Sequence, residues 1–114
     1  MKLPDTKEHP FLREYVLVMI QGGKFACVVE NYRTATYLMN DLRRAPVDEH
    51  FVGITFNSSV ASLIPNNASG GFIKFIYDAH PHRFKGIVFD DVIYFSTPRS
   101  MSRKTALILE SQIR

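Results

Sequence analysis

One amphipathic segment, set between two extended apolar runs, constrains the fold of this chain more than any other feature. The segment NYRTATYLMNDLRRAP (residues 31–46) repeats its apolar residues at the i, i+3, i+4, i+7 spacing of a helix and ends at a proline. Runs typical of strands stand on either side, at 25–29 and 51–56. This order predicts a strand–helix–strand unit. The inner stripe of the helix consists of Ala35, Leu38, Met39 and Leu42.

Residues 12–30 allow two interpretations. The apolar runs YVLVMI and FACVV flank QGGK, and two glycines between such runs are typical of a hairpin. Several apolar residues also fit a helical stripe that Gly22 and Gly23 would end. We prefer the hairpin, because four valines favour extended backbone. The helical stripe would consist of Leu12, Tyr15, Val16, Met19 and Ile20; the valines are Val16, Val18, Val28 and Val29.

The second half of the chain adds strands and a final helix. Residues 60–64 fit either a helical turn or a short strand, and 72–77 and 87–95 read as strands. Thr97 can cap a helix that has Pro98 at its first position. The inner stripe of that helix would be Met101, Thr105, Ile108, Leu109 and Ile113.

These elements predict an α/β fold, because strands and helices alternate over one small sheet. No repeat or linker divides residues 1–114, so we expect a single small domain with a mixed sheet of about five strands and two main helices. The polar residues 1–10 contain two prolines and should form an extended lead-in. The central strands should be 25–29, 51–56 and 87–95.

Composition narrows the environment of the protein. The single cysteine, Cys27, cannot build a disulfide or a zinc cage within one chain, which favours a reducing compartment. No apolar stretch approaches the ~20 residues of a membrane span. We therefore expect a cytoplasmic protein, in the host cytoplasm if the source is a virus, with no membrane partner and no cofactor. Within its predicted strand, Cys27 is better explained as a small buried hydrophobe than as a nucleophile.

The positive charge is concentrated in the second half of the chain. Residues 1–50 carry seven Lys or Arg and seven Asp or Glu, so residues 51–114 hold the whole excess of +3. A basic surface of this kind can attract a phosphate backbone, or it can simply be a solvated helix face. Tyr32 and Phe84 stand next to basic residues, an arrangement that can stack on bases. The predicted binding residues are Arg83, Lys85, Arg99, Arg103 and Lys104.

Acidic and histidine residues form two candidate sites. Asp90 and Asp91 are adjacent in a predicted strand, where successive side chains point to opposite faces, so they should not form a carboxylate pair. One of them should be exposed at an edge, and the other should pair with Lys74, Arg83 or Lys85. The sequence DAHPH alternates three possible ligands, which suits zinc, manganese or iron. The metal hypothesis uses Asp78, His80, His82 and Asp90.

The stretches FACVVENYRTATYLMNDLRRA, FVGITFNSSVASLI and GGFIKFIYDAHPHRFKGIVFDDVIYFSTP follow a familiar order of elements. Together they resemble, over residues 25–96, the nucleotide-binding core of P-loop ATPases of the helicase and viral terminase type. In that family the first loop carries Gly-Lys-Thr; here Thr34, Ala35 and Thr36 stand in its place, and only Thr36 matches. Phe95 and Ser96 stand where that family has Asp and Glu, and Asp91 matches an earlier aspartate. The resemblance implies the same α/β architecture without ATP hydrolysis.

Three functions follow from these observations. We prefer a non-catalytic binding protein, cellular or viral, that acts on nucleic acid or on a nucleic-acid-processing partner through its basic residues. The first alternative is a metal-dependent hydrolase or nuclease that uses the Asp78, His80 and His82 cluster. The second is a homodimeric protein-interaction module, because the strands carry more apolar residues than a few helices can cover.

Overall fold

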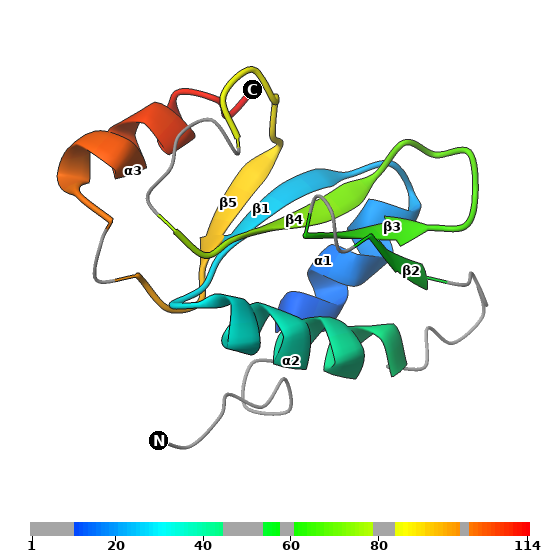
Figure 1. The fold of residues 1–114 in the computed structure, drawn as a ribbon. Helices are drawn as coiled ribbons and strands as arrows, with labels where there is room; N and C mark the ends of the chain where they lie inside the picture. The colour runs from blue at the N-terminus through cyan, green and yellow to red at the C-terminus, as the bar shows by residue number, and fades with distance from the viewer. Residues whose placement is uncertain (1–10, 45–53, 58–60, 79–83, 99–100) are drawn as a thin grey trace.

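The computed structural model describes residues 11–44, 54–57, 61–78, 84–98 and 101–114 (Figure 1). Within these ranges the chain forms three helices and a five-stranded mixed sheet, which confirms the α/β class. None of these helices is long and apolar enough to cross a membrane. The helices are α1 (Phe11–Ile20), α2 (Tyr32–Arg44) and α3 (Arg103–Glu110); the strands are β1 (Lys24–Val28), β2 (Ile54–Asn57), β3 (Ser62–Pro65), β4 (Phe72–Ile76) and β5 (Asp91–Tyr94).

The sheet has the order β2-β3-β4-β1-β5. Strand β1 is parallel to both β4 and β5, whereas β3 is antiparallel to β2 and β4. Strands β2 and β3 form an antiparallel pair at one edge of the sheet. The expectation that 51–56 and 87–95 are central is wrong, because β2 and β5 are the two edge strands. The central place belongs to β4, which buries residues on both of its faces.

Helix α1 replaces the hairpin that the sequence favoured for residues 12–30. Val16, Met19 and Ile20 are buried along one side of the helix, whereas Leu17 and Val18 are exposed. The helix ends at Gly22, whose φ of 109° suits glycine, and Gly23 N–H donates to Val18 O at 2.9 Å. The helical spacing therefore decided the structure of this segment against the preference of valine for extended backbone.

Helices cover both faces of the sheet (Figure 1). Helices α1 and α2 pack on one face, where alternate residues of the strands, such as Phe25, Cys27, Ile73 and Phe75, join the larger apolar cluster. Helix α3 lies against the other face and buries Leu109 in a smaller cluster. Its members are Ala26, Val28, Ile76, Phe84, Phe89 and Leu109.

Gly71 marks the closest approach of the chain to α1. A Cβ atom at this position would lie 1.9 Å from the carbonyl oxygen of Met19 and 2.9 Å from that of Gly23. The adjacent Phe72 N–H donates to the carbonyl of Gly23 at 3.1 Å. Only a residue without a side chain lets the start of β4 lie this close to the end of α1.

Helix α3 begins later than the sequence predicted. Pro98 lies before the helix, and its carbonyl accepts from Met101 N–H at 3.0 Å. The N-cap is Ser102, whose Oγ accepts from Thr105 N–H at 3.2 Å. Thr105 and Leu109 are buried, as the predicted stripe requires. Because Ser102 caps the helix, Arg103 and Lys104 occupy its first turn.

Candidate functional site

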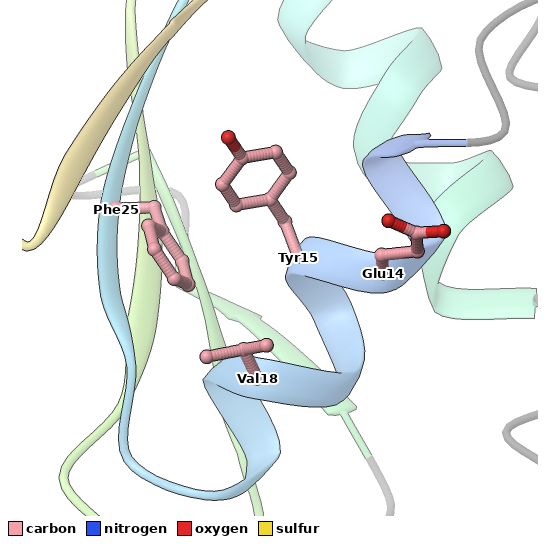
Figure 2. A pocket seen from close by; sticks show the side chains of 4 residues that line it. All are labelled: Glu14, Tyr15, Val18 and Phe25. Atoms are coloured by element: carbon pink, nitrogen blue, oxygen red, sulfur yellow. The ribbon is translucent and has the colours of Figure 1, made fainter.

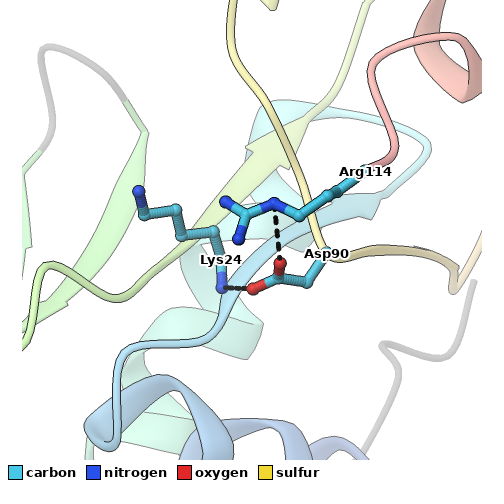
Figure 3. A network of polar contacts seen from close by, with 3 residues as sticks. All are labelled: Lys24, Asp90 and Arg114. Carbon is cyan, nitrogen blue, oxygen red and sulfur yellow. Dashed lines mark hydrogen bonds and ion pairs between the residues drawn. The ribbon is translucent and has the colours of Figure 1, made fainter.

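Asp90 joins the beginnings of β1 and β5. Its Oδ2 accepts from Lys24 N–H at 2.9 Å, and its own N–H donates to Lys24 O at 2.7 Å (Figure 3). Arg114 brings its Nε to 3.7 Å from Asp90 Oδ1, and the Arg114 side chain is 65% exposed. This ion pair lies in solvent and contributes little to stability. The cation that pairs with Asp90 is thus Arg114, whereas the sequence suggested Lys74, Arg83 or Lys85.

Asp91 turns away from Asp90 and binds α1. Its Oδ2 accepts from the Tyr15 hydroxyl at 3.0 Å, and its Oδ1 accepts from the N–H of Val92 at 2.8 Å. Partial burial raises the pKa of Tyr15, and the hydrogen bond to Asp91 raises it further. The two aspartates therefore have separate partners, as strand alternation predicted.

A pocket lies beside Tyr15, between α1 and β1 (Figure 2). Glu14, Tyr15, Val18 and Phe25 line it, and its volume is about 480 Å³. The rings of Tyr15 and Phe25 meet edge to face, with centroids 4.8 Å apart. Phe25 is paired in register with Asp91, so the pocket opens next to the first residue of β5.

The outer side of β5 has no strand partner in the described part of the sheet. Near the end of the chain, Phe89 N–H donates to Gln112 O at 2.8 Å, and Phe89 O accepts from Arg114 N–H at 2.7 Å, so this backbone pairing lies before β5 begins. Phe95 N–H donates inward to Val28 O at 3.0 Å, so the alternation of a strand turns the backbone groups of Val92 and Tyr94 outward.

Tyr94 connects β5 to α3 on the opposite face. Its hydroxyl donates to Glu110 Oε1 at 2.8 Å. Desolvation raises the pKa of Tyr94 to about 12, with further contributions from the hydrogen bond and the negative charge of Glu110. Leu107, one turn before Glu110, is 56% exposed. We call β5 together with Glu14, Tyr15, Val18, Phe25, Leu107 and Glu110 the β5 edge surface.

The proposed metal ligands are not brought together. Asp78 follows the end of β4, whereas Asp90 stands level with the beginning of β1. Because β4, β1 and β5 are parallel, the two aspartates lie at opposite ends of the strands, at least ~13 Å apart at 3.3 Å per residue. His80 and His82 lie outside the described residues. Among the residues described, no group of three His, Cys, Asp or Glu side chains could hold a metal ion.

The predicted basic residues divide between the two ends of α3. Arg103 and Lys104 are exposed in its first turn. Lys85 is exposed in a loop that meets the other end of the helix, where Gln112 Nε2 donates to Ile87 O at 2.8 Å. Arg83 and Arg99 lie outside the described residues.

The loop compared with the P-loop is closed by its own side chains. Asn31 Oδ1 accepts from Thr34 N–H at 2.8 Å, and Thr34 itself is buried. The hydroxyl of Thr36 donates to Tyr32 O at 3.0 Å. On the neighbouring strand, Ser96 Oγ accepts from Glu30 N–H at 2.8 Å. The amides of Glu30 and Thr34 are thus already bonded within the protein, and the resemblance itself stays a prediction.

Sequence reasoning missed most of the β5 edge surface. Tyr15 belonged to the helical stripe that we set aside for the hairpin, so the helical alternative contained the signal. Glu110 lies sixteen residues from Tyr94, and no spacing rule connects a strand residue with a later helix at that distance. No family model, no curated protein and no solved structure matches this chain.

Proposed function

We propose that this domain is a protein-interaction module in which the edge strand β5 pairs with an extended segment of a partner protein. The observation that carries the proposal is the outward orientation of the backbone groups of Val92 and Tyr94, between a pocket on one side and Leu107 on the other. An exposed edge of this kind binds a peptide through main-chain hydrogen bonds, and flanking pockets provide specificity.

Two features support binding without catalysis. Cys27 is fully buried, and desolvation raises the pKa of its thiol to about 12, so it cannot supply a thiolate near neutral pH. Asp90 and Asp91 are each held by different partners and share no substrate position. Cys27 is also a free thiol, which suits the reducing cytoplasm, where we place the module.

Short randomised peptides selected on the immobilised domain test this function. Selected peptides should slow hydrogen exchange at the amide of Tyr94, because this outward N–H would become hydrogen-bonded to the added strand, whereas Val92 N–H already donates to Asp91 Oδ1. The amides of β2, at the opposite edge of the sheet, provide an internal control and should exchange at an unchanged rate. Tight peptides that leave the Tyr94 amide unprotected, or a selection without binders, would contradict the proposal.

Nucleic-acid binding is a second candidate, favoured by the charges in the first turn of α3. This turn contains no acidic residue, and both Arg103 and Lys104 are exposed there. Cations near a helix N-terminus oppose the helix dipole by about 0.3–1 kcal/mol each, so helix stability does not explain them. Contact with a phosphate backbone would explain the two cations at this end of the helix.

Fluorescence anisotropy with labelled single- and double-stranded DNA and RNA tests this second candidate. Binding should be strongest at low salt, weaken steeply as salt is added and fall on charge reversal with Arg103→Glu and Lys104→Glu. If no nucleic acid binds at low salt, or if binding survives the reversal, the basic turn is a solvated helix face.

A further inference from the structure

The pocket of the β5 edge surface lies on the side of the sheet to which Asp91 points. Directly opposed residues of neighbouring strands turn their side chains to the same face. A residue of an added strand that pairs with Asp91 would therefore direct its side chain toward α1. There it would meet the Tyr15 hydroxyl bonded to Asp91 and, beyond it, the pocket.

The walls of this pocket suit a long cationic side chain. Tyr15, Phe25 and Val18 supply apolar and aromatic surface along which a methylene chain can pack. Glu14 adds an exposed carboxylate, and Asp91 adds a second one at the wall formed by Tyr15. Aromatic rings beside carboxylates attract an ammonium or guanidinium group through cation–π and ionic interactions.

The described charges beside the pocket, those of Glu14 and Asp91, are negative. Glu14 is the one charged residue among the described side chains of α1, which cover residues 14–20. Lys24 alternates with Phe25 along β1 and so belongs to the other face of the sheet. A basic partner residue would thus meet complementary charge.

The same charges disfavour a second copy of this chain as the occupant. Two β5 strands that pair antiparallel are related by a two-fold axis perpendicular to the sheet, which places the two α1 sides next to each other. Glu14 and Asp91 of both copies would then lie on the same side of the joined sheet, and carboxylates brought together there repel one another.

We infer that the pocket formed by Glu14, Tyr15, Val18 and Phe25 accepts a lysine or arginine side chain from the extended segment that pairs with β5. This inference rests on the proposed function, since the partner strand delivers the side chain. Tyr15 is a positioning residue in this arrangement. Its hydroxyl holds the Asp91 carboxylate at the pocket wall while its ring packs on Phe25.

The peptide selection described above also tests the inference, through the sequences that it returns. We expect lysine or arginine to be enriched at one position, and norleucine at that position, which keeps the methylene chain without the charge, should weaken binding about tenfold. Glu14→Gln on the domain should remove most of that difference. Glu14 is exposed and makes no described packing contact in the core, so this variant should fold.

The outcomes separate the two proposals. Peptides that protect the Tyr94 amide without a basic preference would overturn the pocket inference and leave the interaction module standing. A selection without binders would overturn both. A basic preference that persists unchanged in Glu14→Gln would also overturn the assigned pocket, because the carboxylate on its rim would then play no part.

A probe that does not need the strand edge gives an independent measurement. Butylammonium chloride should shift the ring resonances of Tyr15 and Phe25 in a saturable way, whereas butanol should not. The Glu14→Gln variant should weaken this response several-fold. Equal responses to butylammonium and butanol would mean that the pocket recognises only the apolar chain.

Discussion

The two faces of the sheet are built differently. Within the described ranges, the face covered by α1 and α2 buries fifteen apolar residues in one cluster, whereas the face under α3 buries six. The α3 face also contains the buried polar pair Ser62 and Lys74, which are opposed in register. Stability should therefore depend mainly on the α1 and α2 face. The α3 layer, which buries fewer apolar residues, should contribute less.

The strongest disruption of the α1 and α2 face should come from Gly71→Ala. Its Cβ would collide with the backbone carbonyl of Met19, so α1 must move off β4, at a cost of more than about 4 kcal/mol. The matched control is Gly70→Ala, whose Cβ meets nothing within 4 Å and which adds only left-handed strain (φ 81°) of about 1 kcal/mol. Urea denaturation measures both, and equal losses would contradict the close approach.

A matched pair of leucines compares the two faces directly. Leu38 on α2 and Leu109 on α3 are both fully buried. Leu38→Ala should destabilise by about 4 kcal/mol and Leu109→Ala by about 2 to 3 kcal/mol, because a single short helix can shift to fill the smaller cavity. Denaturant midpoints with unchanged slopes would measure the difference. A larger loss at Leu109 would reverse the ranking of the faces.

The sequence predicted the parts of this fold that depend on local periodicity. The stripe of α2 and the strand at 25–29 were predicted correctly, because amphipathic spacing and β-branched composition agree there. The prediction for residues 12–20 was wrong because helical spacing and β-branched composition conflict there. The contacts of α1 with β4 and β1 favour the helix. The neighbours of β1 depend on pairings across more than 40 residues, for which a single sequence contains no local signal.

The candidate site was less predictable than the fold. Divergence of Asp90 and Asp91 followed from strand alternation alone. Their partners, Tyr15 and Arg114, come from opposite ends of the described chain and become neighbours only through the sheet order. The pocket depends on α1 being a helix, so the error in that segment also hid the pocket.

On each face of the sheet, a hydrogen bond between a tyrosine and a carboxylate attaches β5 to the covering helix: Tyr15 to Asp91 on the α1 side and Tyr94 to Glu110 on the α3 side. Removing each hydroxyl compares the two faces through smaller losses of stability. Tyr15→Phe should cost about 1 kcal/mol and Tyr94→Phe about 0.5 kcal/mol. The difference arises because Tyr94 is 44% exposed, so water can replace its bond to Glu110 more easily. Thermal denaturation of both variants measures the losses, and a larger loss for Tyr94→Phe would show that α3 depends on this bond more than α1 depends on its counterpart.

The smallest expected effect is a change in the alkaline titration. The raised pKa of Tyr94, about 12 against 10.0 in the unfolded chain, means that folding favours the neutral phenol. Its contribution to stability is fully present below pH 10 and is lost as the pH rises toward 12. Glu110→Gln should lower the pKa only part of the way, because desolvation remains the larger cause.

Phenolate absorbance measures this titration, with Tyr94→Phe identifying the signal that belongs to Tyr94. A pKa that does not move in Glu110→Gln would show that the hydrogen bond between Tyr94 and Glu110 does not form in solution.

The position of β1 also sets the order in which the chain can fold as it is synthesised. Its two partners, β4 and β5, lie 48 and 66 residues later in register, so β1 waits without a sheet neighbour until β4 has left the ribosome, and it gains its second neighbour only after β5 follows. Of the described strands, β2 and β3 can pair with each other before β4 is complete. During that interval the apolar run FACVV stays open to chaperones and to other nascent chains.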